Sequence, residues 1–190
     1  MVEMNYFRGY WVMQDDLCPC DNHFNEWIEA EGITGKTIYH LGTGTHHIIG
    51  QTQSQNESRN RVFAITASKE EYEAYMDLVT ENPRVAKTYV CYFGDIYLTK
   101  PELLPDFDVV TMFHICEFFF PNTASKEYGG LTDPKVLDLF TAKTRKGGYI
   151  LFYKHSMGFH KLEKWLPKWE KKAPVKRVGE FKTLIVYKKK

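Results

Sequence analysis

The stretch that most constrains the fold is residues 36–51, which read KTIYHLGTGTHHIIGQ. A short apolar run leads into the triplet Gly42-Thr43-Gly44, and a second apolar pair follows behind two histidines. This order predicts a buried strand, then a tight glycine turn, then the start of a helix near residue 45. Glycines in such a turn let a ligand approach the backbone, and a helix N-terminus offers it unpaired N–H groups. The stretch therefore predicts an α/β fold with a polar ligand at this turn.

The rest of the chain alternates between strand and helix patterns. Strands are expected at residues 36–41, 61–66, 87–92, 108–113 and 149–153. Helices are expected at residues 21–31, 45–51, 68–82, from 132 or 133 to just before Gly147, and at 159–166. Loops are expected at residues 51–60 and 114–131, and a hairpin at residues 175–178 and 181–187, around Gly179. This alternation predicts a parallel sheet between two helical layers, with the hairpin as an antiparallel edge.

Several helix ends carry sequence signals. Asp21 is expected to cap the N-terminus of the first helix, and Gly32 is expected to end it. Ser68, followed three residues later by Glu71, has the spacing of a capping box. Pro167 is expected to stop or kink the helix that begins at residue 159.

Length and composition predict one globular domain with a substantial core. The chain has 190 residues, of which 43% are hydrophobic and 26% charged. It divides into an N-terminal aromatic arm and helix at residues 1–32 and an α/β core at residues 33–190. No apolar run is long enough to span a membrane, the N-terminus lacks a secretory signal pattern, and the four cysteines do not form a disulfide framework. These features lead us to expect a reduced, cytoplasmic setting.

The charge is small overall but uneven along the chain. The formal net charge is +1, yet residues 1–31 hold seven acidic residues and one basic residue, and residues 161–190 hold eleven basic and three acidic ones. A solvated lysine-rich surface is the simpler interpretation of the basic end, so a nucleic-acid partner is not expected. A small-molecule substrate is the expected partner, and the sequence does not indicate an oligomeric state.

Four segments in a fixed order resemble the class I S-adenosylmethionine (SAM) dependent methyltransferases. They are LGTG at 41–44, GDI at 94–96, LPDFDVV at 104–110 and KGGYILF at 146–152. The resemblance extends over about residues 21–187. It implies a three-layer, Rossmann-like fold with a seven-stranded, mostly parallel sheet in the order 3-2-1-4-5-7-6 and an antiparallel C-terminal hairpin. It also implies a cofactor at the carboxyl ends of strands one, two and four.

The same resemblance implies SAM as the cofactor and a set of residues that hold it. The implied set is Leu41, Gly42, Thr43, Gly44, Thr66, Asp95 and Ile96. In the family, an acid in the position of Asp95 meets the adenine amino group. The alternative for Asp95 is an ordinary role in capping a turn.

The chain also departs from the family pattern at three positions. His40 stands where the family has an acid in strand one, and His46 replaces the third glycine of its GxGxG motif. Thr66 stands where an acid normally grips the ribose hydroxyls, and one hydroxyl cannot bind a diol as a carboxylate does. Three alternatives follow: the affinity for the cofactor is weak, Glu70 or Glu71 substitutes for this acid, or the pocket holds a ligand other than SAM.

His114 and Glu117 follow strand four, in a region where the family places residues that orient or deprotonate the methyl acceptor. The ordinary pKa of histidine suits a general base, although methyl transfer depends largely on proximity and alignment. The alternative is that His114 caps the strand or packs on the aromatic residues 118–120. Tyr128 and His155 are weaker catalytic candidates.

A metal site is the less favoured interpretation of the cysteines and histidines near the N-terminus. Cys18, Cys20 and His23 lie close together in sequence, but their spacing is not a standard zinc pattern. His46 and His47 are adjacent, so on a helix they would point in different directions. We therefore assign no metal ligands from the sequence and expect a histidine that shapes the cofactor pocket.

The leading expectation is a SAM-dependent methyltransferase with a small, aromatic or otherwise planar acceptor. Aromatic residues at 5–13 and 118–120, with Trp165, predict an apolar lid over a closed pocket. Two alternatives remain: a non-catalytic or differently liganded binding module of the same fold, and a metal-dependent enzyme that uses Cys18, Cys20 and the histidines.

Overall fold

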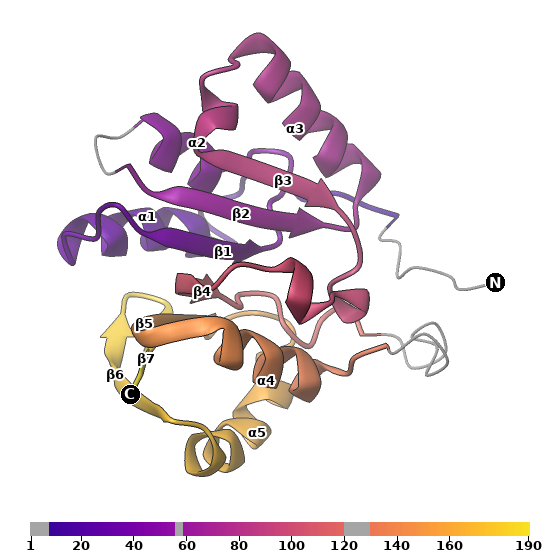
Figure 1. Ribbon diagram of the computed structural model, residues 1–190. Helices are drawn as coiled ribbons and strands as arrows, with labels where there is room; N and C mark the ends of the chain where they lie inside the picture. Colours follow the sequence, from indigo (N-terminus) through magenta and orange to yellow (C-terminus); the bar gives the residue numbers. More distant parts are fainter. Residues whose placement is uncertain (1–7, 56–58, 120–129) are drawn as a thin grey trace.

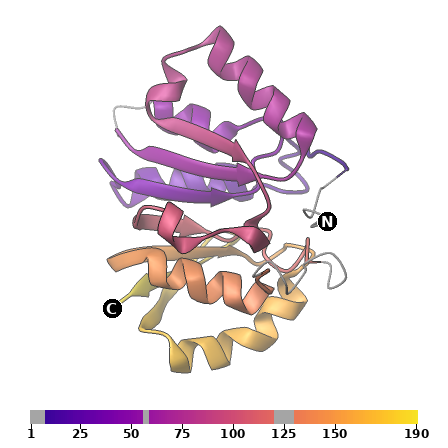
Figure 2. The same cartoon turned by 45° about the vertical axis from the view of Figure 1, so that its right-hand side comes forward.

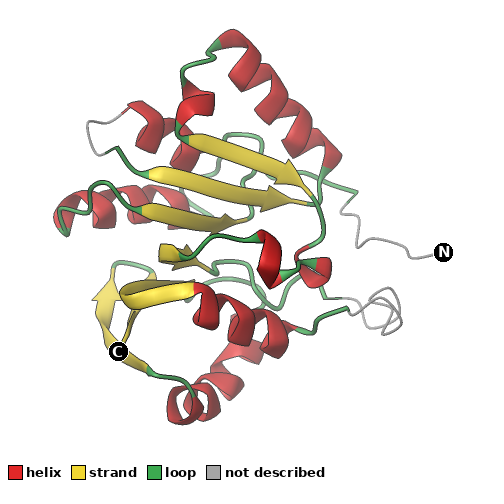
Figure 3. Ribbon diagram, in the orientation of Figure 1, coloured by secondary structure: helices red, strands yellow, loops and turns green. Residues whose placement is uncertain are grey.

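A computed structural model describes residues 8–55, 59–119 and 130–190. Seven strands form a single sheet in the order β3-β2-β1-β4-β5-β7-β6 (Figures 1 and 3). They are β1 Thr37–Leu41, β2 Arg61–Thr66, β3 Tyr89–Phe93, β4 Phe107–Thr111, β5 Thr144–Tyr153, β6 Val175–Phe181 and β7 Leu184–Lys189. The pairs from β3 to β5 are parallel, and β7 runs antiparallel to both β5 and β6. The expected fold class and strand order are therefore confirmed.

Helices cover both faces of this sheet (Figure 2). The α-helices are α1 Cys20–Ala30, α2 Ile48–Gln55, α3 Lys69–Glu81, α4 Asp133–Lys143 and α5 Phe159–Lys172. Short 3-10 helices lie at Val85–Lys87, Ile96–Leu98 and Pro101–Leu103. Among the described residues, no helix has both the length and the apolar character needed to cross a membrane.

Two apolar clusters, one on each face, hold the three layers together. On β1, Ile38 joins the cluster beneath α1 and α2, whereas Tyr39 joins the cluster beneath α4 and α5. Adjacent strand residues point to opposite faces, so a strand buried on both faces is apolar throughout rather than alternating. The continuous apolar runs of the sequence follow from this arrangement, and the carboxyl ends of the parallel strands are left to build a site.

The helix boundaries near the glycine turn differ from the expected ones. α1 begins at Cys20, and its N-cap is Pro19, which makes no side-chain hydrogen bond to the helix. Asp21 is therefore not the N-cap. α2 begins at Ile48 and continues to Gln55, into a segment expected to be a loop. His47 has φ of 46° and breaks the helical path, so the two histidines precede the helix. By contrast, Ser68 does cap α3, accepting the backbone N–H of Glu71.

Three features of the C-terminal third differ from the expectations, among them that Pro167 does not stop its helix. α5 runs through Pro167 because its buried stripe of Leu162, Leu166 and Trp169 continues on both sides of the proline, and this packing offsets the lost backbone hydrogen bond. Gly179 is not the hairpin turn: it lies within β6 at a register shift, and the chain turns at residues 182–183. β5 begins at Thr144, because α4 ends earlier than expected.

Candidate functional site

A cavity of about 300 Å³ opens at the carboxyl ends of β1, β2 and β4. It is lined by most of the residues implied by the resemblance: Leu41, Gly42, Gly44, Thr66, Asp95, Ile96, His114 and Glu117. Thr43 is buried beneath this surface rather than in it. His155 also lines the cavity, whereas Tyr128 and residues 120–129 lie outside the described residues. The position agrees with the general placement of ligands in open α/β sheets.

The glycine turn is tightly built and is covered by the N-terminal arm. Gly42 and Gly44 have φ of 82° and 55°, a region that residues with a side chain enter only at a cost. A Cβ on Gly44 would meet the His46 ring and would lie 2.9 Å from the carbonyl oxygen of Trp11. The same carbonyl accepts the N–H of Thr45 at 2.8 Å. The turn therefore needs glycine both for its conformation and for the approach of another part of the chain.

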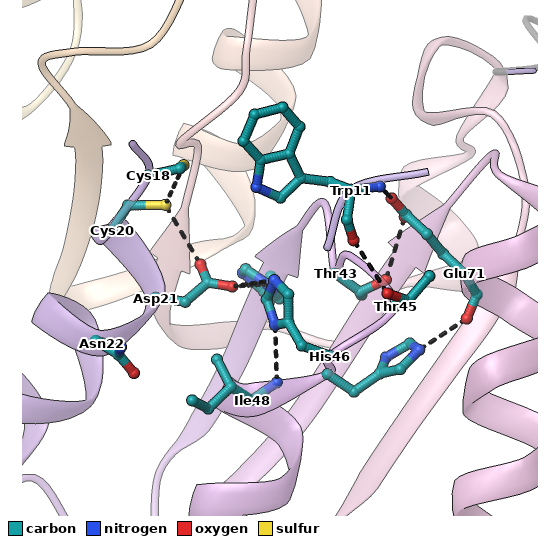
Figure 4. Close-up of polar contacts among 12 residues, drawn as sticks. Trp11, Cys18, Cys20, Asp21, Asn22, Thr43, Thr45, His46, Ile48 and Glu71 are labelled. Carbon is teal, nitrogen blue, oxygen red and sulfur yellow. Dashed lines mark hydrogen bonds and ion pairs between the residues drawn. The ribbon is translucent and has the colours of Figure 1, made fainter. Parts of the chain in front are cut away.

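Glu71 supplies a carboxylate at the end of β2. The Thr66 hydroxyl donates to Glu71 Oε2 at 2.6 Å, and the Thr43 hydroxyl approaches the same oxygen at 3.4 Å. The backbone N–H of Trp11 donates to Oε1 at 3.2 Å (Figure 4). Burial raises the pKa of Glu71, while these donors oppose that shift. An acid therefore stands next to Thr66, where the resemblance called for one, although it comes from α3.

Asp95 follows β3 and turns the chain into a short 3-10 helix. Its carboxylate accepts the N–H of Tyr97 at 2.8 Å, which is the capping role named as the alternative to cofactor binding. Asp95 is buried and also borders the cavity. Capping is thus established, and contact with an adenine remains a prediction.

His114 and Glu117 form a unit just beyond β4. His114 Nδ1 donates to Glu117 Oε1 at 3.2 Å, since a carboxylate can only accept. On the other side of the ring, His114 Nε2 lies 3.9 Å from Cys18 Sγ and 3.8 Å from Cys20 Sγ. These cysteines come from the segment before α1 and from its first residue, about 95 positions away in the chain. The sequence did not predict this convergence, because standard zinc patterns are recognised by the spacing of ligands that lie close together in sequence.

The contacts around His114 change its protonation. Burial by itself would lower the pKa of His114, but the Cys18 and Glu117 side chains beside it raise that pKa to about 10. The hydrogen bond from Cys20 is the main cause that lowers the pKa of Cys18 to about 4, against the effect of burial. In the protein without a metal, Cys18 and His114 are therefore a thiolate and an imidazolium near neutral pH. A pKa raised in this way does not favour the general-base role expected for His114, which stays a prediction.

Asp21 lies between Cys20 and His46 of the glycine turn (Figure 4), and it also approaches His40 of β1. The Cys20 thiol lies 3.4 Å from Asp21 Oδ1, and the Nε2 atoms of His40 and His46 lie 3.9 and 3.8 Å from Oδ2. Burial raises the pKa of Asp21 to about 7 and holds the pKa of His40 well below its ordinary value. His40 also contacts the Thr111 hydroxyl at 2.9 Å, so this buried ring has a hydrogen-bond partner within the core.

His47 has a structural role away from the cavity. Its Nε2 lies 2.7 Å from the backbone oxygen of Glu71, and a carbonyl only accepts, so Nε2 carries the proton. Nδ1 then accepts the hydroxyl of Tyr89 at 2.6 Å. Burial lowers the pKa of His47 to about 4, so the ring is neutral at physiological pH. Of the two histidines, only His46 lines the pocket.

Comparison with known proteins identifies the fold and no closer relationship. No protein-family model matches the sequence, and no curated protein matches it. Among solved structures, a precorrin-6y C5,15-methyltransferase from Geobacter metallireducens is 12% identical with a TM-score of 0.60, over 95% of this chain and 94% of its own. A SAM-dependent methyltransferase from Aquifex aeolicus is 17% identical with a TM-score of 0.55, over 86% and 88% of the two chains.

A third similar structure carries a different chemistry. The [4+2]-cyclase SpnF is 14% identical with a TM-score of 0.52, over 76% of this chain and 50% of its own. The shared architecture thus accommodates more than one reaction, and activity has to be argued from the site. The sheet order, the cavity position and these similarities together show that this chain has the class I methyltransferase fold.

Proposed function

We propose that this protein is a SAM-dependent methyltransferase that acts on a small, aromatic or otherwise planar acceptor. The observation that carries the proposal is the Glu71 carboxylate beside Thr66, at the rim of a glycine turn with two left-handed glycines. The missing ribose-binding acid is one of the three departures from the family pattern, and Glu71 offers a carboxylate beside it.

The residues present fit such a cofactor. The cavity has the volume of a small-molecule pocket, and its walls combine apolar side chains with a few polar groups. Glu71 would accept hydrogen bonds from ribose hydroxyls, because a carboxylate has more acceptor sites than the three donors it meets here. Gly42 would admit the methionine part close to the backbone, and Asp95 and Ile96 would border the adenine.

The cofactor would supply a methyl group already activated on a sulfonium sulfur. The protein then has to hold the acceptor in line with that carbon and exclude water. Leu17, Phe118, Tyr153 and Met157 line the cavity and give it an apolar wall suited to a planar acceptor. The His114–Glu117 unit would border the acceptor and help to position it, but an imidazolium cannot take a proton from it.

Binding of SAM and its demethylated product is the first experiment. Isothermal titration of the purified protein should show binding of both ligands, and no binding at millimolar ligand would reject the proposal. A panel of small aromatic acceptors, followed by mass spectrometry, then tests for transfer. Any turnover excludes a purely non-catalytic binding module, which is the second candidate. That candidate is favoured by His46 in place of a glycine and by the arm that occupies the Glu71 carboxylate.

A further inference from the structure

Three donor atoms from distant parts of the chain converge at one edge of the cavity. Cys18 Sγ and Cys20 Sγ lie 3.5 Å apart, and His114 Nε2 lies 3.9 Å and 3.8 Å from them. All four cysteines of the chain are free thiols, so these two are not bonded to each other. Sulfur and imidazole nitrogen are the donors that zinc prefers in proteins.

The size of this triangle matches one face of a zinc tetrahedron. Typical Zn–S and Zn–N lengths of about 2.3 and 2.05 Å give a sulfur–sulfur edge of about 3.8 Å and sulfur–nitrogen edges of about 3.6 Å. The three observed edges are 3.5, 3.9 and 3.8 Å. An ion can therefore be held with shifts of only a few tenths of an ångström and no change of backbone.

The histidine is already oriented as a ligand. Glu117 accepts the Nδ1–H of His114, which places the lone pair of the neutral ring on Nε2, the atom that faces both sulfurs. A carboxylate behind a coordinating histidine is the usual partner that fixes its tautomer and ring orientation in zinc sites. Glu117 is itself nearly buried, with its side chain 5% exposed, so it holds this orientation away from solvent.

We propose that Cys18, Cys20 and His114 bind one Zn²⁺ ion, with Glu117 as the positioning residue and a fourth coordination position open to the cavity. Two thiolates balance the charge of the ion, and binding displaces the protons that the ligands carry. Among the described residues, no fourth histidine, cysteine or carboxylate atom lies within 4.8 Å of all three donors, and of these three the nearby Asp21 carboxylate approaches only Cys20, at 3.4 Å. Since all three ligands line the cavity, the open position faces the space assigned to the acceptor.

An open position of this kind distinguishes a zinc site that handles a ligand from one that only stabilises the fold. A water molecule, or a thiol or hydroxyl group of a small molecule, would complete the tetrahedron. Coordination lowers the pKa of such a group, so it would enter the cavity as an anion. The metal site stands on its own donors and does not depend on the proposed methyl transfer.

Metal content is the direct test, and it is measured without SAM. Protein purified without chelator should contain one zinc ion per chain by elemental analysis. Replacement with Co²⁺ should give the intense visible bands of a tetrahedral ion and thiolate-to-cobalt charge-transfer absorption. Absence of zinc, together with failure of added Zn²⁺ or Co²⁺ to bind under reducing conditions, would overturn the proposal in favour of a simple thiolate–imidazolium pair.

Variants then assign the ligands. Each of the three ligands is replaced in turn, in Cys18→Ser, Cys20→Ser and His114→Gln. Each variant should lose the bound zinc ion. With Co²⁺, each should lose either the thiolate-to-cobalt absorption or the visible bands of a tetrahedral ion. The matched controls are Cys91→Ala, a buried thiol of β3 outside the cluster, and His160→Gln, an exposed histidine of α5; both should keep a full ion. Wild-type metal affinity in the three ligand variants would refute the assignment.

Glu117→Gln keeps a side chain of similar size and tests the positioning role even if a ligand variant fails to fold. We expect Zn²⁺ affinity, measured by competition with a chelator, to fall about 10–100-fold. An unchanged affinity would contradict that role. Because this readout is metal affinity, a protein that binds zinc but not SAM would leave the site supported while rejecting the proposed methyltransferase.

Discussion

Glu71 is the residue whose replacement best tests the cofactor site. In Glu71→Gln, one carboxylate oxygen becomes an amide NH₂ group. The N–H of Trp11 is fixed by the backbone, so the remaining oxygen should keep that bond. The NH₂ group then faces the Thr66 hydroxyl, which already accepts the N–H of Ser68 at 3.1 Å. The charge-assisted acceptor proposed for a ribose hydroxyl is lost.

The expected loss follows from the value of one such hydrogen bond. Hydrogen bonds to charged groups contribute about 1.5–3 kcal/mol, which corresponds to a rise of about 10–150-fold in the Kd for SAM. The fold should tolerate the change, because the variant also removes the desolvation cost of a buried carboxylate. We expect the free energy of unfolding to change by less than about 2 kcal/mol.

The assay is isothermal titration with SAM, alongside a matched variant on the same helix. Glu73→Gln makes the same chemical change at a side chain that is 59% exposed and pairs with Lys69 on the surface of the same helix. Its Kd should equal that of the wild type. If the Kd of Glu71→Gln lies within twofold of the Glu73→Gln value, Glu71 does not hold the cofactor and the reasoning from its position fails.

Three further predictions concern the turn, acid stability and the last helix. Gly44→Ala should lower the melting temperature more than Gly35→Ala does. Both glycines have φ near 60°, but an added Cβ would meet the His46 ring and Trp11 only at Gly44. Equal shifts in melting temperature would mean that this crowding is unimportant. As pH falls from about 6.5 to 4, protonation of His47 in the unfolded chain should remove about 3 kcal/mol of stability, since its pKa of about 4 when folded lies below the unfolded value. His47→Gln should flatten this part of the urea-derived pH profile, and an identical slope would contradict the assignment. Pro167→Ala should raise the free energy of unfolding by about 1–3 kcal/mol, because it restores a backbone hydrogen bond in α5. Chemical denaturation measures this change, and a loss of stability would show that the proline is favourable there.

Local patterns were sufficient for the architecture. Continuous apolar runs marked strands buried on both faces, as in β2, whose bounds of Arg61 and Thr66 agree with the prediction. Ser68 was recognised as a cap because the signal involves residues three apart. Gly42 and Gly44 were recognised because a strand that enters a glycine pair leaves few alternatives to a tight turn.

The predicted helix ends were wrong where contacts between distant parts of the chain outweighed local sequence preference. Pro167 does not end α5, since the apolar stripe on both sides of it stays buried. Asp21 does not cap α1, since its carboxylate turns toward Cys20, His40 and His46. In each case the deciding contact comes from another element, which no short window of sequence contains.

The sequence by itself determined the sheet, the place of the glycine turn and most residues around the cavity, because these follow from periodicity and from the order of four short segments. Only the tertiary structure decided what the site can do. It turned Glu71 from α3 toward the end of β2, and it brought Cys18 and Cys20 against His114. The protonation of His114 followed from that contact, since a pKa depends on burial and neighbouring charge rather than on residue type.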